Sequence, residues 1–363
     1  MNVLMCCSDL TVKGGMVSVV RNYLSSPDWG DVDIFFVPTH TTGGKLRLAA
    51  MFAQACVRIL PLAAAGQFDV AHLHVAERGS FIRKGLLVRM LHRLGVKTVL
   101  HHHGAEFEEY YASASSRHKR FIRRTLELAD VNIVLSRRLI PMVLDKAPDA
   151  RVEVVYNAVK VPPSNPYTTT DNNRDAVLFL GRLGRRKGTY DLLEAIKRLD
   201  KILPLHIRFL LCGDGEVNEV MSRSKDLGIS HRIDHTGWVD GKLKEEFMRR
   251  SMINVLPSYN EGLPMTILET MAHGIPNIST RIASIPEVIT DEETGLLIEP
   301  GDIDALTRAL SGLIFSSRQR MYISQASYRL VANGFSLPST ISTLKNIYRS
   351  LLPAKPCARR EET

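Results

Sequence analysis

The chain has 363 residues, which is too long for one ordinary domain and suits two domains of about 150 to 180 residues. Apolar residues make up 45% and charged residues 23% of the sequence, a balance that allows a sizeable core and excludes extensive disorder. The formal net charge is +9, and residues 1–160 carry 21 lysines and arginines against 14 acidic residues, so most of the excess lies in the first half.

Short apolar runs alternate with helical patterns along the first half. The runs predict strands at 3–7, 34–37, 68–74, 97–103, 131–136 and 152–157. Helical patterns lie between them at 15–24, 79–94 and 117–129. Continuous β-branched runs separated by helices are typical of parallel strands covered on both faces. Residues 1–160 are therefore predicted to form a Rossmann-like α/β domain.

The alternation restarts after a segment, 161–175, that is rich in Pro, Asn, Thr and Asp and is predicted to be a linker. Strands are predicted at 176–181, 207–213, 253–257 and 276–280, with helices near 188–200, 240–250, 264–273 and 302–315. Residues 176–335 thus form a second Rossmann-like domain, followed by a helix at 336–352 that is expected to pack back toward the first domain and a polar tail at 353–363. The fold class is α/β, with two doubly wound domains that bind ligands at the carboxyl ends of their strands, facing a central cleft.

Glycines and cations follow the first strand of each predicted domain. Gly14 and Gly15 stand directly before a helix, where free backbone N–H groups suit a diphosphate, although a bare tight turn would look the same. Arg182 and Lys187 lie on the glycine-framed loop 181–188, and they could neutralise a leaving diphosphate when no metal is present. The alternative is a generic basic loop.

Two glutamates flank the predicted helix start at Pro264. Glu261 belongs to a polar loop at a strand end, where a carboxylate can bind sugar hydroxyls. Glu269 lies further along the same helix, where it can accept hydrogen bonds from the vicinal hydroxyls of a ribose. Each glutamate alone could instead be surface charge or a partner of the helix terminus.

Three consecutive histidines, His101 to His103, invite a metal interpretation. On a strand, His101 and His103 share one face while His102 faces the other, so the three cannot converge on one ion, and we expect no metal. His103, at the strand end, is expected to reach the ligand-binding edge; a structural histidine satisfied by backbone is the competing interpretation.

Five segments in order over about 120 residues resemble retaining GT-B glycosyltransferases of family four (glycosyl transferases group 1), of the bacterial exopolysaccharide and lipopolysaccharide type. They are G-R-L-x-x-x-K-G (181–188), L-L-C-G-D-G (210–215), H-T-G-W-V (235–239), E-G-L-P with L-E-T-M-A-H-G-I-P (261–276), and T-G-L-L-I-E-P-G-D (294–302). Glu261 and Glu269 match the two glutamates of the family's E-x7-E signature. The first half is similar more loosely, through K-G-G-M, H-H-H-G-A-E-F and V-V-Y-N-A-V.

The resemblance implies a role for each matched residue. Arg182 and Lys187 would bind the donor diphosphate, Glu261 the transferred sugar and Glu269 the ribose, while Gly15 would bind phosphate through its backbone. His103 would contact the donor sugar. The sugar and phosphate site would also include the backbone of Gly262, Leu263, Pro264 and Met265, and Val239 would lie near the nucleobase.

The predicted function is transfer of a hexosyl group from a nucleotide-diphosphate sugar, a UDP-sugar rather than GDP-mannose, to a saccharide or lipid-linked acceptor with retention of configuration and without a metal or other cofactor. Surface polysaccharide biosynthesis is the expected setting. The alternatives are a GT-B-fold epimerase and a non-enzymatic protein that binds sugar nucleotides or nucleic acid. We expect no nucleic-acid partner, because no known binding motif or aromatic platform is present.

The location of the protein is predicted from its charge and cysteines. The five cysteines form no C-x-x-C pair, which is typical of reduced core residues in the cytoplasm. The basic segment 117–124 and its upstream cations could dock on the anionic inner face of the membrane, or could be a solvated helix face. The longest apolar stretch, 48–66, is interrupted by Gln54, Arg58 and Pro61, so we expect no transmembrane helix.

Overall fold

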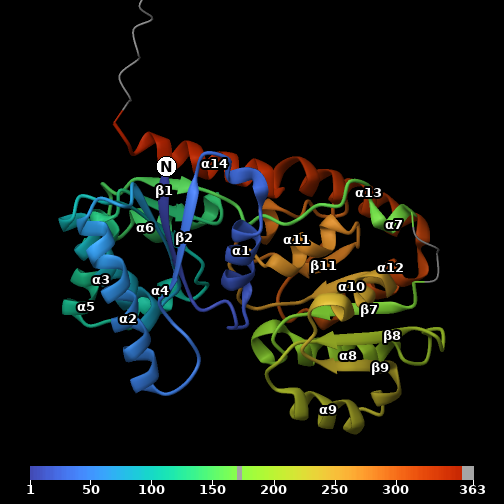
Figure 1. Cartoon of the computed structure of the whole chain (residues 1–363). Helices are drawn as coiled ribbons and strands as arrows, with labels where there is room; N and C mark the ends of the chain where they lie inside the picture. The colour runs from blue at the N-terminus through green and yellow to red at the C-terminus, as the bar shows by residue number, and fades with distance from the viewer. Residues whose placement is uncertain (170–173, 354–363) are drawn as a thin grey trace, which may run out of the picture. The chain divides into compact units, whose positions relative to one another are not determined.

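The computed structural model describes residues 1–169 and 174–353, and these residues divide into two compact units (Figure 1). The first unit contains Met1–Val134, Ile140–Val155 and the described residues from Pro338 onward. The second contains Leu135–Leu139 and Tyr156–Leu337. Residues 170–173 of the expected linker and most of the expected polar tail, 354–363, lie outside the described residues.

The first unit is built on a six-stranded parallel sheet in the order β2-β1-β3-β4-β5-β6. Its strands are β1 (Asn2–Cys7), β2 (Asp33–Pro38), β3 (Val70–Val75), β4 (Lys97–His102), β5 (Val131–Val134) and β6 (Val152–Val154). Central strands β3 and β5 are buried along their whole length because helices cover both faces of the sheet, which explains their continuous apolar sequences. The strand order reverses between β1 and β3, and this switch point is where such sheets bind ligands.

The helices of this unit are α1 (Gly15–Leu24), α2 (Lys45–Ala64), α3 (Gly79–Arg93), α4 (Phe107–Ala112), α5 (Ser116–Leu128), α6 (Ile140–Leu144) and α14 (Leu337–Ser350). Helix α2 runs unbroken through Gln54, Arg58 and Pro61, the residues that interrupt its apolar sequence. It is the one helix of the described chain whose length and composition could cross a membrane.

Helix α14 returns the end of the chain to the first unit. Its Tyr348 is fully buried, stacks on Trp29 with ring centres 6.2 Å apart, and is hydrogen-bonded to the Nδ1 atom of His72. Arg349 donates to both carboxylate oxygens of Asp31 at 3.0 Å. The last helix is therefore part of the core of the first unit although nearly 200 residues of the second unit precede it.

The second unit repeats the same plan. Its parallel sheet has the order β12-β11-β10-β7-β8-β9. The strands are β7 (Ala176–Leu180), β8 (Arg208–Cys212), β9 (Ile233–Gly237), β10 (Ser251–Leu256), β11 (Asn277–Thr280) and β12 (Leu296–Ile298). The helices are α7 (Pro166–Thr169), α8 (Thr189–Leu199), α9 (Val217–Asp226), α10 (Gly241–Arg250), α11 (Met265–Ala272), α12 (Ile303–Phe315) and α13 (Ser317–Gly334). Its switch point lies between the neighbouring strands β7 and β10.

Some elements of the second unit depart from the sequence-based expectation. Edge strand β9 was not expected because it carries Asp234, His235 and Thr236 and lacks an apolar run. Helix α7 lies within the expected linker, yet Tyr167 is buried there and its hydroxyl donates to the Met252 carbonyl at 2.9 Å. Part of that segment is thus fixed to the second unit by a buried side chain.

Candidate active site

The loop after β7 carries the two cations that were expected to bind phosphate. Arg182 follows the strand after Gly181, and Lys187 ends a short 3₁₀ helix, Arg185–Lys187. Gly188 then adopts a left-handed conformation (φ 69°), and a Cβ atom at this position would lie 2.0 Å from the carbonyl oxygen of Pro257. Only glycine fits there, so the loop after β7 lies directly against the loop after β10.

Lys187 and Glu261 form an ion pair between these two loops, since the Nζ atom bonds to Oε1 of the carboxylate. Their side chains are 14% and 6% exposed, respectively. The Ser258 hydroxyl also donates to Glu261 Oε1 at 2.7 Å. Because a buried charge is costly without a partner, each of these two residues depends on the other. The cation expected for the diphosphate and the carboxylate expected for the sugar are therefore in direct contact at the switch point.

Arg182 is the more exposed of the two cations on the loop after β7. Its side chain is 67% exposed and its closest carboxylate oxygen, on Asp214, lies 4.0 Å away. Asp214 follows β8, where a Cβ atom on Gly213 would come within 1.8 Å of the Gly181 carbonyl oxygen. This close packing holds the loops after β7 and β8 together and leaves the guanidinium free to bind an anion.

The segment 262–265 leads into helix α11. Pro264 has an extended backbone (φ −69°, ψ 122°) and precedes the helix as its cap, so the helix begins one residue later than expected, at Met265. The Leu263 carbonyl accepts a hydrogen bond from Asn157 at 2.8 Å, and the Gly262 carbonyl accepts one from the Ser284 backbone. The cap residue Pro264 makes no side-chain hydrogen bond to α11, which leaves N–H groups at the start of the helix available to a ligand.

Glu269 has a partner that the sequence analysis did not identify. Lys244, on α10, donates to Glu269 Oε2 at 2.7 Å, and the two side chains are 27% and 19% exposed. A hydroxyl-bearing ligand would have to share this carboxylate with the lysine. Val239, expected near a nucleobase, is 7% exposed, and it packs in the core with Phe247 and Met248.

In the first unit, the glycine loop follows β1 at the switch point. Helix α1 begins at Gly15, and its cap residue Gly14 has a φ of 146° and no side chain with which to cap the helix. Both glycines are exposed. The N–H groups at this helix start are open, and the anion-binding role expected for Gly15 stays a prediction.

His103 directly follows β4 and is half-buried beside a group of buried histidines. His101 and His103 share one face with ring centres 4.3 Å apart, while His102 faces the other way and bonds to Asn132. The neighbouring strand β3 adds His72 and His74, and His74 Nδ1 is hydrogen-bonded to His103 Nε2 at 2.8 Å. Burial lowers the pKa of His103 to about 3, so its imidazole is neutral at physiological pH.

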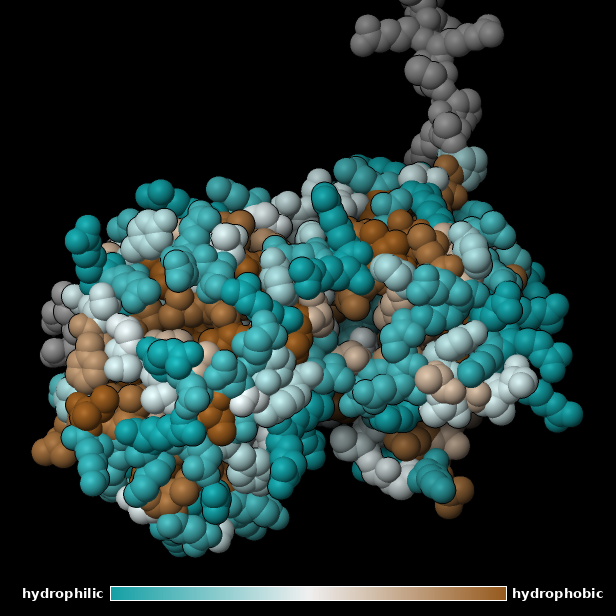
Figure 2. Space-filling view, turned by 180° about the vertical axis from the view of Figure 1, so that it is seen from behind, coloured by the Kyte–Doolittle hydropathy of each residue, from teal (hydrophilic) through white to brown (hydrophobic). Residues whose placement is uncertain are grey.

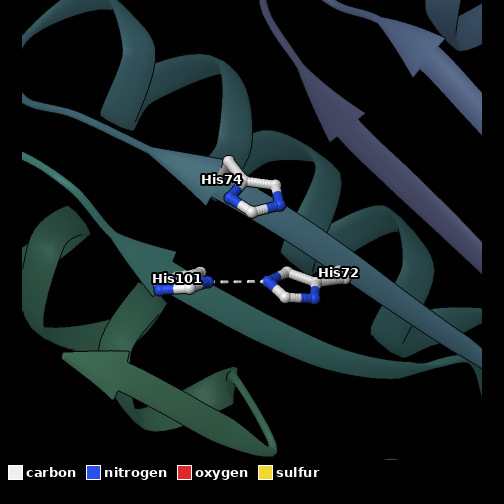
Figure 3. A group of neighbouring side chains, drawn as sticks. All are labelled: His72, His74 and His101. Carbon is white, nitrogen blue, oxygen red and sulfur yellow. Dashed lines mark hydrogen bonds between the residues drawn. The ribbon is translucent and has the colours of Figure 1, made fainter. Parts of the chain in front are cut away.

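A metal here could be held only by a group of three histidines that the sequence analysis did not consider. His72, His74 and His101 each place one ring nitrogen within 4.8 Å of the others (Figure 3). His72 Nε2 and His101 Nδ1 are already hydrogen-bonded at 3.0 Å, and within residues 1–169 and 174–353 no carboxylate bonds to any of the three. A fully buried dication would lack a compensating charge at this position. Strand alternation alone predicts that His72 and His74 share a face, but only the pairing of β3 with β4 brings them to His103.

Comparison with known proteins finds a matching family for each half of the chain. The family described as Glycosyltransferase Family 4 matches residues 14–161, and the family described as Glycosyl transferases group 1 matches residues 166–330. Together they account for most of the chain. The chain is a glycosyltransferase-family protein.

Individual relatives agree with this assignment. The lipopolysaccharide core biosynthesis glycosyltransferase LpsE of Rhizobium meliloti is 29% identical over 188 residues, which is 52% of each chain. The Escherichia coli UDP-Gal:alpha-D-GlcNAc-diphosphoundecaprenol alpha-1,3-galactosyltransferase is 24% identical over 89% of this chain and 85% of its own. The structure of Anabaena HepE in complex with UDP superposes with a TM-score of 0.74 at 15% identity, covering 96% of this chain and 100% of HepE.

The expected fold class is confirmed for this glycosyltransferase: two Rossmann-like units, each with a parallel six-stranded sheet, of the kind found in GT-B glycosyltransferases. Its candidate residues fall into two groups. Arg182, Lys187 and Glu261 gather at the carboxyl ends of β7 and β10, with Glu269 on the helix that follows. Gly15 and His103 follow β1 and β4 of the first unit.

Proposed function

We propose that this glycosyltransferase moves a hexosyl group from a UDP-sugar to a saccharide or lipid-linked acceptor, with retention of configuration, in the biosynthesis of a bacterial surface polysaccharide. The observation that carries this proposal is the buried contact between Lys187 and Glu261 beside the exposed Arg182 at the switch point of the second sheet. It supplies cations and a carboxylate at adjacent strand ends, which are the groups that a diphosphate and a sugar require.

The proposed chemistry follows from the charges that develop. When the bond between the sugar carbon and the diphosphate oxygen breaks, negative charge builds up on the diphosphate and positive charge on the sugar ring. Arg182 and Lys187 stabilise the leaving diphosphate, and the acidic Glu261 interacts with the sugar. The acceptor hydroxyl forms the new bond on the face that the diphosphate leaves, and its proton passes to the departing phosphate. Under this proposal the transfer requires no metal.

Two residues of the first unit also take part in the proposed reaction. Backbone N–H groups at Gly15 bind phosphate, and His103 meets the sugar as a neutral imidazole because burial keeps its pKa near 3. A neutral ring can orient a hydroxyl by hydrogen bonding without adding a charge next to a developing cation. Glu269 binds the ribose, and the backbone of 262–265 binds the sugar and phosphate.

The choice of substrate rests on the names of similar proteins. The E. coli relative is named for UDP-galactose and a diphosphoundecaprenol acceptor, the R. meliloti relative for the lipopolysaccharide core, and HepE is known in complexes with UDP and UDP-glucose. These support a UDP-sugar over GDP-mannose and a glycan acceptor, which is either free or lipid-linked.

The test is transfer by the purified chain in EDTA, with a panel of UDP-hexoses and GDP-mannose and with free and polyprenyl-diphosphate-linked saccharides. NMR of the product should show the anomeric configuration of the donor, and Glu261→Gln should abolish the product while Glu293→Ala, at an exposed loop glutamate, should not. An inverted product would refute retention. Conversion of the free UDP-sugar into its epimer would support the epimerase alternative, and nucleotide binding without any reaction would support a binding protein.

A further inference from the structure

Helices α2, α3 and α5 form one layer over a face of the first sheet (Figure 1). Helix α3 contacts both α2 and α5. We call the outward side of these three helices the outer helix surface. None of the candidate active-site residues belongs to it, so its composition must have another explanation.

Helix α2 exposes an apolar stripe on this surface. Ala55, Ile59 and Ala63 are buried and fix one side of the helix to the unit. The opposite side exposes apolar residues at every third or fourth position: Leu46, Ala50, Ala53, Val57, Pro61 and Ala64. Leu46 is 89% exposed and Val57 is 75% exposed. Figure 2 shows hydrophobic side chains at the lower tip of the first unit, where one end of α2 projects in Figure 1.

Helix α3 continues the apolar exposure. Ile82 and Leu86, one turn apart, are 39% and 40% exposed, and Leu94 directly after the helix is 39% exposed. Exposed apolar side chains gathered on neighbouring helices can mark a site that contacts another molecule or a membrane.

The same surface is strongly cationic. Lysine and arginine number three on α2, four on α3 and five on α5, whereas Glu127 is the single acidic residue of these helices. Only Lys84 among these cations is buried. Across the described chain, none of them forms an ion pair with a carboxylate. Burial first, and then the nearby charges of Arg124 and Arg93, lower the pKa of Arg89, which lies on α3.

We propose that the outer helix surface docks on an anionic membrane surface, the inner face of the bacterial membrane, with α2 lying in the lipid interface. Unpaired cations match anionic headgroups, and the apolar stripe of α2 matches the boundary of the acyl chains. Nucleic acid would use the cations but not Leu46 and Val57. A spanning orientation would require α2 to leave the contacts that its buried side makes within the unit.

Docking would hold the glycosyltransferase where lipid-linked acceptors are found, a consequence that rests on the proposed function. The docking itself does not, because none of the residues proposed to bind the donor lies on α2, α3 or α5. The two proposals can therefore fail separately.

The experiment is sedimentation of the full chain with vesicles of phosphatidylcholine alone or with phosphatidylglycerol. Binding is expected only to the anionic vesicles. It should weaken in roughly 0.5 M salt, because salt at that concentration screens exposed charges. The double variant Arg120→Gln/Arg124→Gln should lower the partition coefficient by roughly thirtyfold, as expected for two cations at an anionic surface. Leu46→Gln/Val57→Gln should lower it several-fold at either salt concentration.

Matched controls come from the second unit. Lys201→Gln removes an exposed cation there, and Leu205→Gln removes a leucine that is 81% exposed; neither should change vesicle binding. All variants should keep the UDP-dependent thermal shift of the unmodified chain. Equal binding to neutral and anionic vesicles, or no binding to either, would overturn the proposal. Binding to a DNA duplex that depends on Arg120 and Arg124 but not on Leu46 and Val57 would replace the membrane with nucleic acid.

Discussion

His74 Nδ1 and His103 Nε2 lie 2.8 Å apart and are hydrogen-bonded, so a buried residue of β3 fixes the ring of the histidine at the end of β4. Under the proposed function, in which His103 meets the sugar, this hydrogen bond makes His74 a positioning residue. His74→Phe keeps an aromatic ring in the stack but removes the nitrogen. We expect kcat to fall by roughly tenfold to a hundredfold, the usual range for a residue that supports a reacting group, with little change in the KM for the donor.

The split between kcat and KM separates this role from a general effect on the fold. Urea unfolding of His74→Phe checks that the protein remains folded at the assay temperature. Equal losses in kcat for His74→Phe and His103→Phe would agree with the two acting as a unit. A His74→Phe enzyme with unchanged kcat would show that the hydrogen bond to His103 does not matter for the reaction.

The ion pair between Lys187 and Glu261 predicts a distinctive set of variants. Lys187→Met leaves a buried carboxylate without its partner, which should cost about 3–5 kcal/mol of stability and lower kcat by roughly a hundredfold to a thousandfold. The double variant Lys187→Met/Glu261→Gln removes both charges, so its stability should largely recover while its activity does not. Urea unfolding and steady-state kinetics measure the two effects. Recovery of activity in the double variant would contradict a direct role for these groups.

Gly188 predicts a steric test of the loop contact. Gly188→Ala would place a methyl group 2.0 Å from the Pro257 carbonyl oxygen in a left-handed backbone, and it should destabilise the protein by at least about 2 kcal/mol and weaken UDP binding. Gly334→Ala is the matched control, because its Cβ would meet nothing within 4 Å. Thermal unfolding with and without UDP compares them. Two variants of equal stability would refute the close contact between the loops after β7 and β10.

The buried histidines predict that stability falls in mild acid. Burial lowers the pKa of His72 to about 3, whereas the unfolded chain has the ordinary value near 6.5, so below pH 6.5 protons bind to the unfolded state first. Between about pH 6.5 and pH 3 this residue alone should reduce the free energy of unfolding by about 1.4 kcal/mol per pH unit. Urea unfolding at pH 7 and pH 5 measures the effect, and His72→Phe should make the dependence shallower. The same unfolding free energy at both pH values would contradict a buried neutral His72.

The anchoring of α14 can be tested through its most buried residue. Tyr348→Ala removes a fully buried ring that stacks on Trp29 and should cost about 3–5 kcal/mol. Tyr348→Phe removes only the hydroxyl that is bonded to His72 and should cost about 1–3 kcal/mol. Urea unfolding distinguishes the two when it is followed by Trp29 fluorescence in a Trp238→Phe background, which removes the second tryptophan of the chain. A Tyr348→Ala protein as stable as the unmodified chain would show that α14 is not part of this core.

Much of the fold could be predicted because both sheets are buried on both faces. Runs such as 3–7 and 176–181 are apolar at every position, and they are strands β1 and β7. The edge strands of the second sheet gave no such signal, because β9 is polar and β12 has only three residues. Helix α2 was not predicted, because its sequence is apolar but irregular. The side on which its apolar stripe is exposed depends on how the helix packs against the rest of the first unit.

The candidate site was predictable only to the level of loops. The sequence places Lys187 and Glu261 after two strands, but their contact depends on β7 and β10 being neighbours, which results from the strand order. Likewise, the bond between Lys244 and Glu269 joins residues 25 positions apart on two helices. Strand pairing also brings His74 to His103. Such contacts between elements carry no local pattern in the sequence.

Nucleotide binding tests the central claim, donor recognition by the second unit, most directly. A thermal-shift panel of UDP, GDP, ADP and their sugar conjugates should be run with and without EDTA on the unmodified chain, Glu269→Ala and Glu293→Ala. The account predicts a rise in Tm with UDP and UDP-sugars that is insensitive to EDTA, lost in Glu269→Ala and kept in Glu293→Ala. No rise with any nucleotide would contradict it.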